Sequence, residues 1–244
     1  MFAGLKWLFL VACAVVLTGG CTAPSPSFAY PPAFPPLMRA KDQPLTAKSV
    51  AVEKFQDFRG KCNDLDPIYI YLIPLCPFGY FEYDRPENGE WFMSIEKFNF
   101  DPATDLARAA TVSMEKSNLF GRVIPCGDKE AANADYILKG AVLSTFYRGR
   151  AFSYGLSCEG AWLWMLGAPA GTSLNRLGFM LWLVDRHTGK TVWTYGFEQE
   201  EYLTQWLYFR YGSDVSMFSR LMAEGMNGAV MEMEKFLSIP PGGK

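Results

Sequence analysis

The sequence has very little histidine: His187 is the only one among 244 residues. A zinc site built on paired imidazoles is therefore excluded, and a histidine-activated serine or cysteine nucleophile would have to use His187 itself. That residue lies in a predicted turn, Asp185–Lys190, where a histidine is typically solvated. The stretch 155–160 resembles a nucleophile elbow only superficially, because it has one residue too many before its second glycine.

An excess of charge of one sign is also missing. The chain holds 23 lysines and arginines against 25 acidic residues, so electrostatics would not attract nucleic acid or an anionic lipid surface. No glycine-rich phosphate loop is present. The acidic groups Asp84 with Glu87, and Glu198 with Glu200 and Glu201, are typical of solvated strand ends, and an acid–base pair of a hydrolase is the alternative. These absences predict a binding or scaffolding protein with no catalytic residue, cofactor or metal.

The N-terminus has the pattern of a secretory signal over residues 1–20. Lys6 precedes an apolar run, Trp7–Leu17, that is too short for a transmembrane helix. The sequence LTGGC at 17–21 resembles the lipobox of bacterial lipoproteins. The resemblance implies that Cys21 carries fatty acyl chains such as palmitate, and that Thr22, in place of aspartate, favours the periplasmic face of the outer membrane. A plain secretory signal with an accidental cysteine is the alternative.

Residues 21–46 have the composition of a tether. Seven prolines between Pro24 and Pro44 exclude a helix and favour an extended chain, at about 3.1 Å per residue where it is polyproline-like. Residues 47–239 would then form a single periplasmic domain, followed by a short tail at 240–244.

Few cysteines remain for the folded body once Cys13 leaves with the signal and Cys21 is acylated. An even number in an oxidising compartment predicts two disulfides, with three possible connectivities. We favour Cys76–Cys158, because each of these residues belongs to or precedes an apolar run that ends in a Pro/Gly turn. The four cysteines in question are Cys62, Cys76, Cys126 and Cys158.

Hydrophobic periodicity predicts an α+β fold. Asp101 and Pro102 are typical of the N-cap and first turn of a helix, and Gly189 is suited to a hairpin turn. The predicted fold is a mixed sheet of about four to five strands with helices packed on one face and two apolar insertions. The expected elements are strands at 48–60, 121–126 and 134–150, a hairpin at 177–202, and helices at 101–120 and 213–237.

Three motifs give a family resemblance. The segments SVAVEKFQDFR (49–59), ADYILKG (134–140) and LVDRHTGKTVW (183–193), followed by an amphipathic helix, occur in that order in a group of small envelope lipoproteins. The group includes auxiliary lipoproteins of ABC-type transport, the curli-secretion lipoprotein and lipoprotein activators of penicillin-binding proteins. The resemblance implies a compact α/β domain and a non-enzymatic role.

The two apolar insertions, Pro67–Tyr83 and Glu159–Leu174, are predicted to pair as neighbouring protrusions at one end of the domain. They either cover the open face of the sheet as a lid or remain exposed as a docking surface. The candidate partner-binding residues are Tyr71, Leu72, Phe78, Tyr80, Trp162, Trp164 and Trp206.

The predicted function is that of a non-catalytic, membrane-anchored accessory or scaffolding component of an envelope transport, secretion or cell-wall assembly. Its expected partners are the membrane, through the N-terminal lipid, and an envelope complex or further copies of itself. The alternative is a carrier of lipid or another apolar ligand, with the aromatic insertions forming its cleft.

Overall fold

A computed structural model describes residues 43–88, 100–125, 127 and 129–238. The predicted signal, Cys21, most of the tether and the tail at 240–244 lie outside these residues. The 3-10 helices are η1 (Asp66–Leu72), η2 (Pro86–Asn88), η3 (Lys129–Asn133) and η4 (Ser157–Gly160), and the α-helices are α2 (Pro102–Ser117), α3 (Ala161–Met165) and α4 (Val215–Ser238). The strands are β1 (Thr46–Val52), β2 (Gln56–Asp57), β3 (Asn63–Asp64), β4 (Phe78–Tyr83), β5 (Phe120–Ile124), β6 (Tyr136–Ser144), β7 (Tyr147–Phe152), β8 (Pro169–Asp185) and β9 (Thr191–Trp206).

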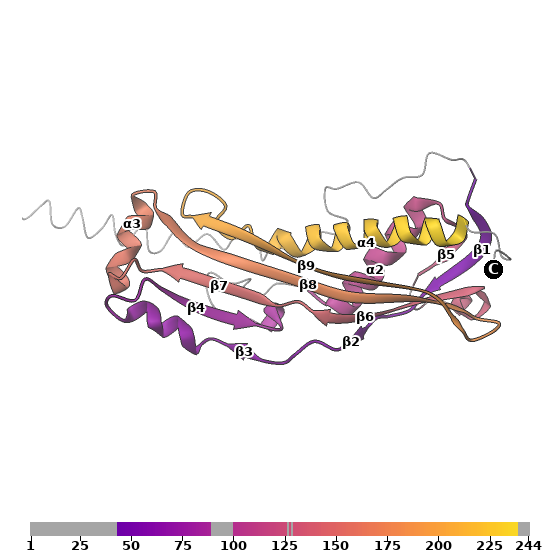
Figure 1. Cartoon of the computed structure of the whole chain (residues 1–244), viewed down its shortest axis with the longest axis horizontal. Coiled ribbons are helices and arrows are strands. Elements are labelled where there is room, and N and C mark those ends of the chain that lie inside the picture. Colours follow the sequence, from indigo (N-terminus) through magenta and orange to yellow (C-terminus); the bar gives the residue numbers. More distant parts are fainter. Residues whose placement is uncertain (1–42, 89–99, 126, 128, 239–244) are drawn as a thin grey trace, which may run out of the picture.

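The nine strands form one long sheet, in which β8 is central (Figure 1). Along one edge, β8 pairs with β9 over almost its whole length. Along the other edge it pairs first with β7 and then with β6, so that β6 and β7 act as one long strand with an irregularity between them. The outer strands differ at the two ends, with β4 and β3 beside β7, and β1, β2 and β5 on the side of β6. Strand β1 runs parallel to β5 and β6.

The predicted sheet of four to five strands is therefore wrong. Both supposed insertions contribute to the sheet: Phe78–Tyr83 forms β4, and Pro169–Leu174 is the first part of β8. The prolines of the first insertion argued against a strand. They lie before β4, however, in η1 and in the turn that follows it. A strand tolerates prolines at its boundary, where no ladder hydrogen bond is lost.

Two helices cover one face of the sheet. Alternate residues of β8 point to this face and are fully buried, as expected for the period of a strand. Helix α4 approaches β8 closely: a Cβ at Gly225 would lie 2.6 Å from the Phe179 ring, so only glycine fits there. Helix α2 begins as predicted, since Asp101 accepts a hydrogen bond from the backbone N–H of Thr104 at its N-terminus.

No helix among the described residues covers the opposite face of the sheet, the open face, which carries charged side chains. Arg148 pairs with Glu82 across β7 and β4, and Lys139 lies 3.6 Å from Glu53. The apolar insertions do not cover this face. Ala151 and Tyr147, against which they pack, point to the same side as α4, because the Tyr147 hydroxyl contacts Asp214 just before that helix. The predicted lid over the open face is thus not formed.

A buried arginine holds the irregular junction of β6 and β7. Arg59 is 6 % exposed and donates to Asp57 (3.0 Å), Glu87 (2.8 Å) and the Thr145 hydroxyl (2.7 Å) at that junction. Hydrogen bonds from Arg59 lower the pKa of Asp57 to about 2, against an ordinary value of 3.8. The cluster therefore ties the segment after β2 to the point where the long strand bends.

This cluster predicts a loss of stability in acid. Because the folded pKa of Asp57 lies below its unfolded value, its contribution is complete above about pH 5 and is lost as the pH falls towards 2. The contribution is at most on the order of 2 kcal/mol. Urea unfolding of the wild type and of Asp57→Asn should differ by about that amount at pH 7, and the difference should shrink below pH 4. A difference that does not change with pH would contradict the assignment.

Among the described residues, no helix is long and apolar enough to cross a membrane.

Candidate functional site

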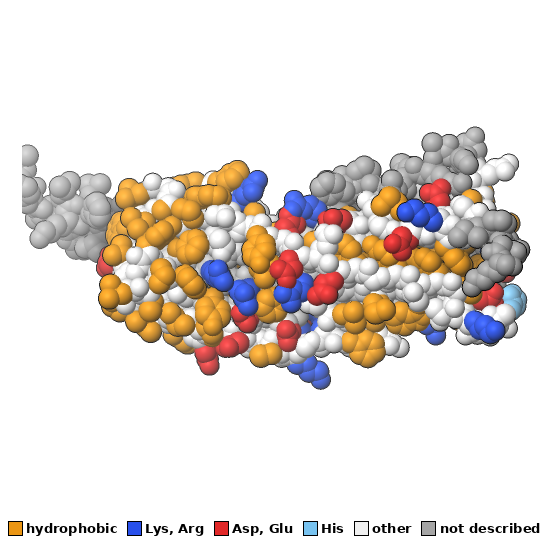
Figure 2. All heavy atoms as spheres, viewed as in Figure 1, with side chains coloured by type: hydrophobic (Ala, Val, Ile, Leu, Met, Phe, Trp, Pro, Cys, Tyr) orange, Lys and Arg blue, Asp and Glu red, His pale blue; other side chains and the backbone are white. Residues whose placement is uncertain are grey.

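Three segments that are distant in the sequence meet at one end of the sheet, and we call this end the apolar pole. It consists of residues 65–78, 152–169 and 202–212. The hydroxyl of Ser157 donates to the Leu72 carbonyl (2.8 Å), and the hydroxyl of Tyr208 donates to the Met165 carbonyl (3.2 Å). The two insertions themselves lie side by side, as predicted, because Tyr71 of the first contacts Trp164 of the second. Figure 2 shows hydrophobic side chains gathered over this end, which carries α3 in Figure 1.

The inner layer of the apolar pole is part of the core. Trp164 is only 8 % exposed, and its indole N–H donates to the Phe152 carbonyl (2.8 Å). The ring of Tyr71 meets it edge-on, at 6.2 Å between centroids. Burial, together with the nearby Cys158, raises the pKa of Tyr71 above its ordinary value. Of the predicted partner-binding residues, Trp164 and Tyr71 are therefore placed in the packing of the domain.

A small apolar cavity of about 290 Å³ lies in this layer. The residues around it come from η1, β7 and α3, and almost all of its surface is hydrocarbon. It is lined by Ile68, Tyr69, Tyr71, Leu72, Ala151, Ala161 and Trp164. A cavity of this character excludes ions and favours an apolar group.

The outer layer of the apolar pole is exposed to solvent. Leu75 is 90 % exposed, Leu166 is 83 % exposed and Trp162 is 62 % exposed, and each lies at or near the turn of its segment. Leu75 also has a left-handed backbone (φ 69°), which is strained for a branched apolar residue. Other exposed apolar residues of the pole are Tyr69, Leu72, Ile73, Tyr154, Leu156, Met165, Tyr202, Leu207, Tyr208, Phe209 and Tyr211. Isolated exposed apolar residues are common, whereas large contiguous apolar patches are in general typical of interaction surfaces.

A buried polar network fixes the third segment of the pole to the sheet. The carboxylate of Asp214 is buried and accepts hydrogen bonds from the hydroxyl of Tyr147 and the amide of Gln205. The side-chain oxygen Oε1 of Gln205 accepts a hydrogen bond from the backbone N–H of Gly212 (2.7 Å). Burial and the charge of Asp214 raise the pKa of Tyr147 well above its ordinary value, so this hydroxyl stays protonated. The loop after β9 is therefore held at both of its ends.

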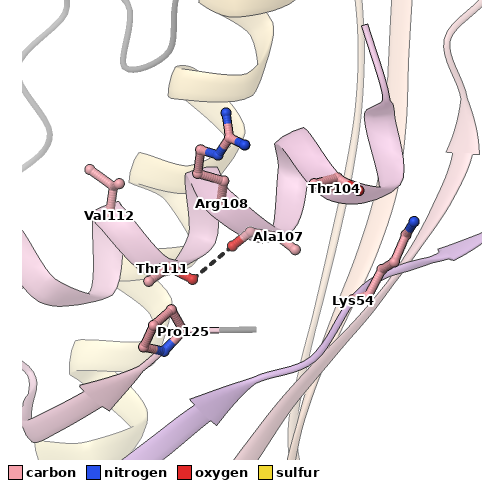
Figure 3. Close-up of a pocket in the computed structure, with 7 residues that line it drawn as sticks. All are labelled: Lys54, Thr104, Ala107, Arg108, Thr111, Val112 and Pro125. Carbon is pink, nitrogen blue, oxygen red and sulfur yellow. Dashed lines mark hydrogen bonds between the residues drawn. The ribbon is translucent and has the colours of Figure 1, made fainter. Parts of the chain in front are cut away.

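A second hollow, of about 250 Å³, lies between α2 and the segments that follow β1 and β5 (Figure 3). Its two cations already have carboxylate partners: Lys54 lies 3.7 Å from Asp101, and Arg108 lies 3.9 Å from Asp105. The hydroxyl of Thr111 donates to the Ala107 carbonyl within α2, the contact drawn in Figure 3. Both described cations of the hollow already have a carboxylate partner, so the hollow offers no unpaired cation to an anion.

Four of the five carboxylates considered for acid–base chemistry are engaged in structural contacts. Glu87 pairs with Arg59, Glu200 with Arg176 and Glu201 with Arg220. One carboxylate oxygen of Asp84 accepts from the backbone N–H of Cys62 (3.0 Å). Glu198 is exposed on β9.

The serine and histidine considered for nucleophilic chemistry lie at opposite ends of β8. Ser157 is in η4 at the apolar pole, whereas His187 is in the turn after Asp185. No group of three or more metal-binding side chains occurs in the part of the chain that the structure describes.

The remaining predicted site residues have different positions. Leu72 and Trp162 are exposed on the apolar pole, whereas Phe78 and Tyr80 lie half-buried on β4. Trp206 ends β9, where its ring packs against the Phe209 ring at a tilt.

The predicted Cys76–Cys158 disulfide is not formed. Cys62, Cys76 and Cys158 are free thiols, and Cys126 lies outside the described residues. The segments carrying Cys76 and Cys158 do lie together: the backbone N–H of Leu75 donates to the Gly155 carbonyl (2.9 Å). Hydrogen bonds and ring packing join them, where the sequence suggested a covalent bond.

Sequence reasoning missed the most exposed residues of the pole, Leu75, Leu166 and Tyr208. Each lies in or beside a run of large apolar residues, but only its position in a turn distinguishes it from its buried neighbours. Leu75 lies between two prolines and Leu166 precedes a glycine. These residues are typical of turns, so they could have indicated that both leucines are exposed.

No protein-family model matches the chain, and no curated protein is similar to it in sequence. Among solved structures, protein XCC0632 from Xanthomonas campestris has a TM-score of 0.43 at 11% identity, covering 86% of this chain and 96% of that one. The PelC dodecamer from Paraburkholderia phytofirmans has a TM-score of 0.34 at 14% identity, covering 74% and 87%. Lipoprotein GNA1162 from Neisseria meningitidis has a TM-score of 0.28 at 13% identity, covering 72% and 99%. Likenesses this distant do not assign the chain to a family.

Proposed function

We propose that this protein is a non-catalytic lipoprotein of the bacterial envelope, acylated at Cys21 and facing the periplasm from the outer membrane. The observation that carries the proposal is the sequence LTGGC at 17–21, which follows an apolar run and precedes a proline-rich segment. Several acyl chains, each stabilising by about 0.8 kcal/mol per buried methylene, make such an anchor effectively permanent. The domain then acts as an accessory or scaffolding component of an envelope transport, secretion or cell-wall assembly.

The size of the cavity in the pole favours docking over lipid carriage. An engineered apolar cavity of about 150 Å³ holds one benzene molecule, so the volume of about 290 Å³ suits a single short apolar group. Binding sites for drug-sized ligands measure about 300–1,000 Å³, so this cavity lies at the lower limit of that range. A diacyl lipid would not be enclosed here, and the exposed outer layer is then better explained as a contact surface.

Replacing Cys21 with serine should abolish acylation. Metabolic labelling with radioactive palmitate is expected to mark the wild type and to leave Cys21→Ser unlabelled, because serine provides no thiol for the diacylglycerol. The matched control is Cys158→Ser, which removes an exposed thiol of the folded domain and should retain the label. Label that persists in Cys21→Ser, or a mature wild-type protein whose Cys21 is unmodified by mass spectrometry, would refute the proposal.

A further inference from the structure

We propose that the apolar pole inserts into the interfacial layer of a lipid bilayer. The inference rests on the proposed envelope location; its first three arguments do not depend on acylation of Cys21, and its fourth does. It concerns the occupant of the exposed outer layer: a lipid surface, and not a protein partner.

The first argument is charge. Each of the three segments of the apolar pole carries one charged residue: Asp66 in the first, Glu159 in the second and Arg210 in the third. Insertion therefore desolvates few charges, and charge is the main cost of placing a protein surface in a membrane. The same composition provides little charge complementarity for a protein partner, and it makes binding independent of anionic lipid.

The second argument is that several hydrogen-bond donors of the pole already have acceptors within the domain. The hydroxyls of Tyr154, Ser157 and Tyr208 donate to the backbone carbonyls of Pro169, Leu72 and Met165. The indole of Trp164 likewise donates within the pole. A protein–protein interface usually forms about one hydrogen bond per 100–200 Å², whereas these donors already have partners inside the domain. The exposed surface is left mostly hydrocarbon and aromatic.

The third argument is the presence of two exposed arginines, one in the apolar pole and one on the adjoining strand β7. Arg150 lies on the open face of β7, with its guanidinium 5.2 Å from the centroid of the Phe78 ring. Arg210 lies 5.0 Å from the Phe209 ring. Among the described residues, neither arginine forms an ion pair. Exposed aromatic and arginine side chains together are typical of the headgroup level of a bilayer, where arginine contacts lipid phosphates.

The fourth argument is reach. The described chain starts at the end of the sheet opposite the apolar pole (Figure 1). Strand β8 has 17 residues and is therefore about 56 Å long, at about 3.3 Å per residue. Twenty-one residues lie between Cys21 and Gln43, and a fully extended chain over that interval spans at most about 75 Å. The apolar pole can therefore reach the membrane in which Cys21 is anchored.

Vesicle co-sedimentation tests the inference. The mature chain with Cys21→Ser is used, so that binding reports the pole and not an acyl chain. It is expected to bind vesicles of phosphatidylcholine and vesicles that also contain phosphatidylglycerol about equally, with little effect of salt. The double variant Leu75→Asp/Leu166→Asp should bind at least about tenfold more weakly, because two carboxylates would enter the interface. Both positions are exposed, so thermal unfolding should be unchanged.

The matched control is Met231→Asp, an exposed apolar residue of α4 away from the pole, which should leave vesicle binding unchanged. Absence of binding to either vesicle, or equal binding by the double variant, would overturn the inference. So would a pole that binds no vesicle but self-associates or binds an envelope protein through Leu75 and Leu166. None of these outcomes affects the palmitate result at Cys21, so the two proposals fail separately.

Discussion

Replacing Asp214 with alanine is expected to lower the free energy of unfolding by about 3 kcal/mol or more. The carboxylate is buried and accepts hydrogen bonds from Tyr147 and Gln205. Its loss leaves the fully buried Tyr147 hydroxyl without this acceptor. An unsatisfied buried donor costs about 1–3 kcal/mol, and a broken contact to a charged group costs more. Urea denaturation followed by circular dichroism measures the change.

Asp214→Asn is the matched control, because its amide oxygen can still accept from Tyr147 in a side chain of the same shape. It should cost clearly less than alanine. The alanine variant should also free the loop at 207–213, which limited proteolysis would detect as earlier cleavage at the apolar pole. A loss of less than about 0.5 kcal/mol in Asp214→Ala would show that the network does not hold this loop.

Replacing Trp164 with alanine should destabilise the domain by about 3–5 kcal/mol. This range is typical of a buried tryptophan, and the deletion would enlarge a cavity that already measures about 290 Å³. The same change removes the hydrogen bond to the Phe152 carbonyl and the contact with Tyr71. Thermal and urea unfolding would report the loss.

The chain provides its own control two residues away, on the same short helix. Trp162 is mostly exposed, so Trp162→Ala should change the free energy of unfolding by less than about 0.5 kcal/mol. Equal effects of the two substitutions would contradict the division of the pole into an inner packed layer and an outer exposed layer. Trp164→Phe, which keeps most of the packing but not the indole N–H, should fall between the two.

Local signals predicted some elements well. Asp101 and Pro102 identified the start of α2, because an N-cap acts through contacts within one helical turn. The turn at Gly189 identified the β8–β9 hairpin, since positive φ is required there. The first part of β8 was missed because its partners on β7 and β9 are remote in the sequence.

The candidate site was predicted only in outline. The sequence showed that two aromatic segments have a similar design and should pair, and their contacts agree with this. It could not distinguish Trp164 from Trp162, because the short helix α3 turns one indole inwards and the other outwards. It also suggested a disulfide where hydrogen bonds join the segments.

The sequence alone determined the N-terminal leader pattern, the presence of a single histidine, the capping of α2 and the turn at Gly189. Each of these depends on composition or on residues within a few positions of one another. Only the tertiary structure decided that residues 65–78, 152–169 and 202–212 form one apolar pole at the end of a nine-stranded sheet. Strand register brings these segments together, and register is set by pairings between distant parts of the chain.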